Sequence, residues 1–298
     1  MNERSSFSGK IGFVLAAAGS AVGLGNIWRF PYLAAKNGGG LFLLCYIILA
    51  LTFGFTLLTT EVAIGRKTQQ SPRTAYGIIH KGWDKLGILS CIVPIIILPY
   101  YCAIGGWVLK YFCTFIAGNV EATVEDGYFT GFITSDVAPI IYAIIFIAAT
   151  AIIVYLGVEG GIERYSKVLM PALFLMIIGI AIYSLTLKND ANGVVTTGLD
   201  GLKVYILPDF TGLTFSKLLS VILDAMGQLF YSISVAMGIM VTYGSYMRKN
   251  DDLEKSVRNI EIFDTGIAFL SGMMIIPAVF AFSGGDPEAL QKGPTLMF

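Results

Sequence analysis

The chain has 298 residues, of which 55% are hydrophobic and only 13% charged, and its mean hydropathy is +0.74. A soluble domain carries about 25% charged residues, so this composition excludes an ordinary soluble domain and indicates a membrane protein surrounded by lipid. The formal net charge is zero, which gives no indication of a nucleic-acid partner.

Seven apolar runs follow one another along the chain, and each approaches or exceeds the ~20 residues that cross a bilayer as a helix. We therefore predict an all-α integral membrane protein with seven spans, and no removable signal peptide is expected before the first of them. The runs cover residues 11–35, 41–64, 87–117, 138–156, 168–187, 217–246 and 262–282.

Lys and Arg residues in the connections predict the orientation, because cytoplasmic loops carry an excess of both. With the N-terminus inside, thirteen of these residues lie on the inner side and five on the outer side. We therefore expect a multi-pass protein of the cell inner (plasma) membrane with a cytoplasmic N-terminus. The inner set is Arg4, Lys10, Arg66, Lys67, Arg73, Lys81, Lys85, Arg164, Lys167, Arg248, Lys249, Lys255 and Arg258, and the outer set is Lys36, Lys188, Lys203, Lys217 and Lys292.

Two of the seven runs contain residues that weaken a helix at membrane depth. The first, GSAVGLGNIWRFPY (19–32), has three glycines within seven residues, and Asn26 and Arg29 follow; the sixth, GQLFYSISVAMGIM (227–240), contains two serines and a late glycine. Freed backbone groups persist at that depth only where they are buried in protein or line a wet cavity. The two runs cross the membrane in opposite directions, a pattern typical of an inverted repeat with a transport site at its centre.

Other classes of membrane protein fit the sequence less well. The glycines of GLGNIW do not match the dinucleotide pattern G-x-G-x-x-G, no G-x-S-x-G or H-E-x-x-H occurs, and the single histidine, His80, lies in a predicted inner loop. We therefore do not expect an enzyme. A channel would need a continuous polar lining or a repeated filter, whereas the sequence indicates one enclosed polar region. The four cysteines lie in apolar runs without a C-x-x-C pair, so neither a zinc site nor a disulfide framework is indicated.

Four stretches resemble the neurotransmitter:sodium symporters, a family that includes bacterial amino-acid transporters such as LeuT. They are GSAVGLGNIWRFPYLAAKNGGGLFLLCY (19–46), EVAIGR (61–66), DAMGQLFYSISVAMG (224–238) and TYGSYMRKNDD (242–252). The resemblance implies sodium-coupled symport of a hydrophobic or aromatic L-amino acid by alternating access, and it implies no particular oligomer.

The resemblance also implies a LeuT-like inverted-repeat fold with discontinuous helices 1 and 6. The first five-helix repeat would cover residues 1–187, an extracellular loop 188–216, and a partial second repeat, with its first two helices, 217–298. Because family members have more helices than this chain, we expect a sequence truncated after helix seven. A truncated, inactive or regulatory fragment of such a transporter is the alternative function.

Contacts to the substrate are implied by the resemblance at the two breaks and on the third span. The carboxylate is expected on the backbone amides of Leu24 and Gly25 and the hydroxyl of Tyr101, because free amides and the positive dipole end face one side of an unwound helix. Gly23 stands where amine carriers place Asp, which favours an amino acid over an amine. Helical spacing alone would favour an ordinary core for the side-chain pocket. The ammonium is expected at Ala21, Tyr231, Ser232 and Ser234, and the side chain against Ile97, Tyr101, Tyr231, Ala236 and Met237.

Two sodium ions are implied as well, since sodium is a hard cation that prefers oxygen ligands. The first site would use Ala21, Asn26, Ser232 and Asp264, and the second would use Gly19 and Val22. Chloride-dependent relatives have Asn where this chain has Asp264. A carboxylate there balances the sodium charge itself, so we predict no chloride requirement.

The resemblance assigns gating roles to residues on both sides of this site. Arg29 and Gln228 would lie outward of the Tyr101–Tyr231 pair. Arg4 and Phe7 would form an inner latch. Glu61 would bond the unwound backbone of the first helix, or it would mark the cytoplasmic interface. Gly161 and Pro171 are expected to let the fifth helix unwind; a helix start and a tolerated kink are the alternative.

Overall fold

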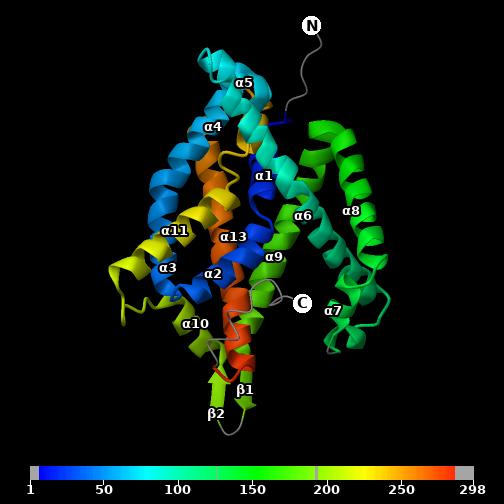
Figure 1. Ribbon diagram of the computed structural model, residues 1–298, viewed down its shortest axis with the longest axis vertical. Coiled ribbons are helices and arrows are strands. Elements are labelled where there is room, and N and C mark those ends of the chain that lie inside the picture. The colour runs from blue at the N-terminus through cyan, green and yellow to red at the C-terminus, as the bar shows by residue number, and fades with distance from the viewer. Residues whose placement is uncertain (1–6, 126, 192–193, 286–298) are drawn as a thin grey trace.

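The computed structural model describes residues 7–125, 127–191 and 194–285. Helices make up most of it, as the composition predicts (Figure 1). Within these ranges the strands form one short hairpin, in which Lys188 pairs with Thr197 in antiparallel register. The strands are β1 (Lys188–Ala191) and β2 (Val194–Thr197).

Five helical segments in the described part of the chain are long and apolar enough to cross a membrane, and a bent pair makes a sixth if it is one span. The bent pair consists of α1 (Lys10–Ala21) and the continuous η1 (Gly25–Arg29) and α2 (Phe30–Lys36), at 50° to each other. The five are α3–η2–α4 (Gly40–Leu49, Ala50–Gly54, Phe55–Thr68), α6 (Asp84–Ile116), α8 (Ala138–Tyr155), η4–α9 (Val158–Glu163, Arg164–Thr186) and α13 (Leu253–Phe282).

The predicted sixth span, 217–246, differs from the expectation. The structure divides it into α11 (Phe215–Ser232) and α12 (Ile239–Ser245), and neither qualifies as a membrane span. Lys217 and Asp224 lower the apolarity of α11, while the break leaves α12 too short to cross a bilayer. By this criterion the described residues contain five spans, or six with the bent pair, and the sixth predicted run is a broken helix that is not counted among them.

Shorter elements lie at the two ends of the molecule. In Figure 1, α5 lies at one end, and the hairpin lies with α10 at the opposite end. The predicted outer loop 188–216 therefore contains regular structure. Thr197 caps the start of α10, because its side chain accepts a hydrogen bond from the Asp200 amide at 3.3 Å. The short elements are α5 (Pro72–Ile79), η3 (Glu121–Val124), α7 (Tyr128–Ile133) and α10 (Gly198–Ile206).

Helix α13 runs through the middle of the bundle and packs against α1, α4, α9 and α10 (Figure 1). Its buried apolar residues include Ile260, Ile267 and Ile276. By contrast, α8 lies at the edge against α6 and has no buried residue. An apolar helix with this exposure needs lipid or another helix around it.

Glycines let α4 and α12 approach each other closely. A Cβ on Gly65 would lie 2.0 Å from the Val241 carbonyl oxygen, and one on Gly244 would lie 2.4 Å from the Val62 carbonyl oxygen. Small residues serve the same purpose at many membrane helix interfaces. This contact holds α12, the second half of a broken span, against α4.

Candidate functional site

The first break lies where the glycines predict it. Helix α1 ends at Ala21, Val22 is extended, and a new π-helical segment begins at Gly25. The Gly23 carbonyl accepts from the amides of Asn26 and Ile27 at 3.1 and 3.2 Å. Amides at the start of the new segment have no acceptor within their own helix, so the break presents polar backbone inside the bundle.

The second break follows Ser232 and ends at Gly238. Two residues that are not glycine have a left-handed backbone there, Ser234 at φ 56° and Ala236 at φ 62°. Such conformations cost of order 1–3 kcal/mol each and gather at functional sites. The Ala236 amide donates to Glu61 Oε1 at 2.7 Å. The prediction that Glu61 bonds the backbone of the first break is wrong. Because α4 packs against α12, its carboxylate lies at the second break instead.

A buried polar cluster joins the two breaks to α13. Asn26 Nδ2 donates to Asp264 Oδ1 at 2.8 Å, and Ser232 Oγ lies 2.8 and 3.0 Å from the two oxygens of Asp264. Ser232 Oγ also lies 3.1 Å from Asn26 Oδ1, and the Tyr46 hydroxyl approaches Asp264 Oδ2 at 3.5 Å. Asn26, Ser232 and Asp264 are all almost completely buried.

The chemistry of this cluster fits a small cation. None of the ion pairs among the described residues involves Asp264. A buried carboxylate without a cation is costly, and three side chains offer oxygen atoms within hydrogen-bond distance of one another. A hard monovalent cation with oxygen ligands would satisfy both conditions.

The predicted second sodium site is less defined. The Val22 side chain packs in an apolar cluster with Met170, Ile177 and Ile267, between α9 and α13. A Cβ on Gly19 would lie 3.3 Å from Met170 Sδ. The assignment of Gly19 and Val22 to a second ion therefore stays a prediction from the resemblance.

The two aromatic residues of the predicted substrate site, Tyr101 and Tyr231, lie together beside the first break. The rings of Tyr101 and Tyr231 are 6.3 Å apart, and a Cβ on Gly25 would lie 3.0 Å from Tyr231 Cδ1. Leu24 and Ala21 lie at the break itself, with Leu24 half-buried and Ala21 buried.

The other predicted lining residues are placed less uniformly. Ser234 is buried, Ile97 and Met237 are half-buried, and Ala236 is exposed. Their assignment to the pocket stays a prediction.

The predicted outer gate residues connect the two broken spans. Arg29 Nη1 donates to the Gly227 carbonyl at 3.3 Å, and its guanidinium lies 5.3 Å from the centre of the Tyr231 ring. Gln228 Nε2 donates to the Gly25 carbonyl at 2.8 Å. Further out along the same two helices, Lys36 pairs with Asp224 at 3.2 Å. The segment η1–α2 and the helix α11 are thus bonded to each other on the outer side of the two breaks.

The opposite end of α1 is bonded to α12 and α9. Arg4 lies outside the described residues, whereas Phe7 is buried and stacks on Tyr243, and Arg248 Nε donates to its carbonyl at 2.8 Å. Sequence reasoning missed the neighbouring contact, in which the Ser8 amide donates to Glu163 at 2.8 Å. No spacing in the sequence indicates a pair 155 residues apart.

The predicted hinge residues lie in an unbroken helical segment. η4 and α9 are continuous from Val158 to Thr186, with Pro171 inside, and the helix starts after Gly157 at φ 84°. A Cβ on Gly161 would lie 2.0 Å from the Ile153 carbonyl oxygen. The start-and-kink alternative describes this conformation, and unwinding stays a prediction.

Comparison with known proteins gives these features a family. The model of the Sodium:neurotransmitter symporter family matches residues 4–125 and 133–292. The chain belongs to this family. Its members among the relatives described below are sodium-dependent transporters, which confirms the expectation that the chain is not an enzyme.

The relatives are considerably longer than this chain. It is similar to the uncharacterized sodium-dependent transporter YhdH of Bacillus subtilis, 37% identical over 98% of the chain and 62% of the relative. An uncharacterized sodium-dependent transporter of Haemophilus influenzae is 33% identical over 99% of the chain and 65% of the relative. A solved structure, MhsT in complex with L-phenylalanine, is 36% identical with a TM-score of 0.85 and covers 99% of this chain and 64% of that one. The chain thus spans less than two thirds of each.

Proposed function

We propose that this chain functions in sodium-coupled symport of a hydrophobic or aromatic L-amino acid by alternating access, across a cell inner membrane with its N-terminus in the cytoplasm. The observation that carries the proposal is the buried cluster of Asn26, Ser232 and Asp264. It joins both broken spans to α13, and its carboxylate lacks a cation partner among the described residues. Sodium at this cluster would couple the ion to the conformation of both breaks.

The choice of substrate rests on the surroundings of the first break. Amides at a helix start favour a carboxylate, and the Tyr101–Tyr231 pair offers aromatic surface beside it. MhsT, which is 36% identical to this chain, is described in complex with L-phenylalanine. L-phenylalanine is therefore the first substrate to test, with Leu24, Gly25, Ile97, Met237 and Ala236 proposed as its contacts.

Asp264 supports chloride independence of the proposed transport. Its carboxylate supplies a fixed negative charge beside the proposed sodium ligands, so a mobile anion is not needed for charge balance. The second sodium ion, at Gly19 and Val22, and the unwinding of the segment between Gly161 and Pro171 belong to the same proposal.

Sodium-dependent binding of labelled L-phenylalanine by the purified full chain tests the site. Ser232→Ala removes a hydroxyl that contacts both Asn26 and Asp264, and we expect it to weaken the apparent sodium affinity roughly tenfold. Ser232→Thr should restore it. Ser216→Ala on the exposed start of the same helix is the control. Binding that is independent of sodium, or equal loss in both alanine variants, would refute the assignment.

Uptake by proteoliposomes tests transport separately. A sodium gradient should drive accumulation of L-phenylalanine, and replacing chloride by gluconate should leave the rate unchanged. Collapse of uptake in gluconate would refute chloride independence. Sodium-dependent binding without accumulation would support the site and refute transport by this chain alone.

A further inference from the structure

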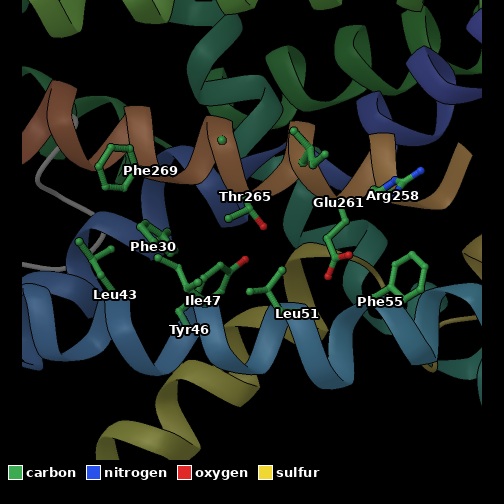
Figure 2. Close-up of a pocket in the computed structure, with 13 residues that line it drawn as sticks. Phe30, Leu43, Tyr46, Ile47, Leu51, Phe55, Arg258, Glu261, Thr265 and Phe269 are labelled. Carbon is green, nitrogen blue, oxygen red and sulfur yellow. The ribbon is translucent and has the colours of Figure 1, made fainter. Parts of the chain in front are cut away.

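A cavity of about 620 Å³ opens between α13 and the continuous helix α3–η2–α4, away from the proposed substrate site (Figure 2). Figure 2 shows the side chains of Glu261 and Thr265 directed from α13 toward Leu51 and Tyr46 on the facing helix. Tyr46 therefore separates this cavity from Asp264, which its hydroxyl approaches at 3.5 Å. The cavity shares Tyr46 with the polar cluster around Asp264, but none of its lining residues is among the proposed substrate contacts.

The cavity is polar at one end and apolar at the other. Arg258 and Glu261 lie at the end nearest the start of α13, and Phe269, Phe30 and Leu43 line the other end. From Arg258 to Phe269 the helix rises about 16 Å, at 1.5 Å per residue. Because the predicted topology puts the start of α13 at the cytoplasmic surface, the charged end faces the inner head groups and the apolar end faces the membrane interior.

Two polar atoms in the cavity wall have no hydrogen-bond partner among the described residues. They are Glu261 Oε1 and Thr265 Oγ1, one helical turn apart on the same face of α13. Glu261 is only 7% exposed. The facing helix offers the Glu261 carboxylate the Phe55 backbone amide but no side chain for Oε1, because a Cβ on Gly54 would already lie 2.8 Å from that oxygen. A buried carboxylate oxygen in apolar surroundings requires a hydrogen-bond donor or a cation.

We propose that this cavity binds a phospholipid of the cytoplasmic leaflet whose head group carries a primary ammonium. The ammonium donates to Glu261 Oε1 and to the Thr265 hydroxyl, and the exposed Arg258 guanidinium pairs with the phosphate. One acyl chain lies along Ile47 and Leu51 toward Phe269. The head group is specified by hydrogen bonding: a quaternary ammonium has no N–H to donate, and a purely anionic head would meet the Glu261 carboxylate.

Native mass spectrometry of the purified full chain tests the head-group preference. Phosphatidylethanolamine and phosphatidylcholine with identical acyl chains are titrated separately. We expect one phosphatidylethanolamine to bind roughly tenfold more tightly than phosphatidylcholine, because hydrogen bonds to a charged group are lost with the latter. Glu261→Gln should reduce the preference to about twofold or less, while Glu254→Gln, at an exposed carboxylate outside the cavity, should retain it. Equal affinities in the wild type, or an unchanged preference in Glu261→Gln, would overturn the proposal.

A second variant fills the cavity without touching the charged groups. A Cβ on Gly266 meets nothing within 4 Å, and Gly266 lines the cavity, so Gly266→Leu adds bulk where the acyl chain would lie. It should abolish binding of the tight lipid, whereas Gly179→Leu, at an equally open glycine on α9, should not. A photoreactive side chain at Ile47 should cross-link to lipid in native membranes. Cross-linking to a polypeptide instead would show that a helix fills the groove and would refute the lipid assignment.

Discussion

The contact between the N-terminal segment and α9 provides a direct test of the inner gate. Glu163 accepts from the Ser8 amide at 2.8 Å and from the Ser8 hydroxyl, and it pairs with Lys167 at 2.6 Å. Only 1% of the Glu163 side chain is exposed. Substituting glutamine retains the shape of the side chain but removes its charge and one acceptor oxygen. We expect Glu163→Gln to release both the start of α1 and the segment η4.

The free energy lost in Glu163→Gln follows from the individual contacts of this side chain. A hydrogen bond to a charged group contributes about 1.5–3 kcal/mol. The ion pair between Lys167 and Glu163 adds less than about 1 kcal/mol. The Lys167 side chain is 42% exposed, so solvent screens the attraction. Since glutamine can still accept one hydrogen bond from Ser8, we expect the substitution to remove about 2–3 kcal/mol of the free energy that holds the start of α1 against α9. That corresponds to a roughly 30- to 150-fold larger population of the open state, in which the start of α1 is separated from α9.

Hydrogen–deuterium exchange of the full chain in detergent measures this population, because protected amides exchange through local opening. Peptides covering residues 7–21 and 158–171 should exchange faster by the same factor, with the remainder unchanged. Glu159→Gln is the matched control, since Glu159 lies on the same π-helical segment but is exposed. Exchange within threefold of the wild type, or equal acceleration in the control, would refute the role of Glu163 as a latch.

Two further predictions concern stability. Gly244→Ala places a Cβ 2.4 Å from the Val62 carbonyl oxygen, so we expect about 1–3 kcal/mol of destabilisation from overpacking and a lower Tm in detergent; Gly227→Ala, at an open glycine, should leave the Tm unchanged. The hydrogen bond from the Thr197 hydroxyl lowers the pKa of Asp200 from its ordinary value of 3.8. This contact therefore stabilises the start of α10 at pH values above 3.8, and the stabilisation is lost as the pH falls through the lower pKa of the folded state. The protection of the amides of residues 198–206 against hydrogen exchange should decrease on acidification. In Thr197→Val this protection should no longer depend on pH.

Glycine density made the first break predictable, because helix-weakening residues act on their own segment of backbone. The structure leaves Val22 to Leu24 outside the helices, within the predicted region. The cluster of Asn26, Ser232 and Asp264 was predictable only through the family resemblance. These residues are separated by up to 238 positions, and no periodicity connects side chains on different helices.

Other features were missed for different reasons. The Ser8–Glu163 contact depends on how α1 crosses α9, which no local pattern encodes. Glu61 reaches the second break and not the first, because the glycine contacts between α4 and α12 bring those helices together. Glu261 did carry a signal: a carboxylate within a membrane span is a functional hypothesis by default, and it lies three residues before Asp264.

The π-helical segment η2 has a consequence for the evolution of this protein. A π-helical turn accommodates an extra residue within an otherwise regular helix, so Ala50–Gly54 sets the angular phase between the two halves of the span Gly40–Thr68. Deleting one residue there would restore the regular α-helical pitch with little change of phase beyond it, whereas deleting one residue elsewhere in the span would rotate everything beyond the deletion by about 100°. A deletion between Phe55 and Glu61 would therefore turn Glu61 away from Ala236 while Tyr46 stayed beside Asp264. Length changes in this span are therefore constrained far more tightly than substitutions on its lipid-facing side.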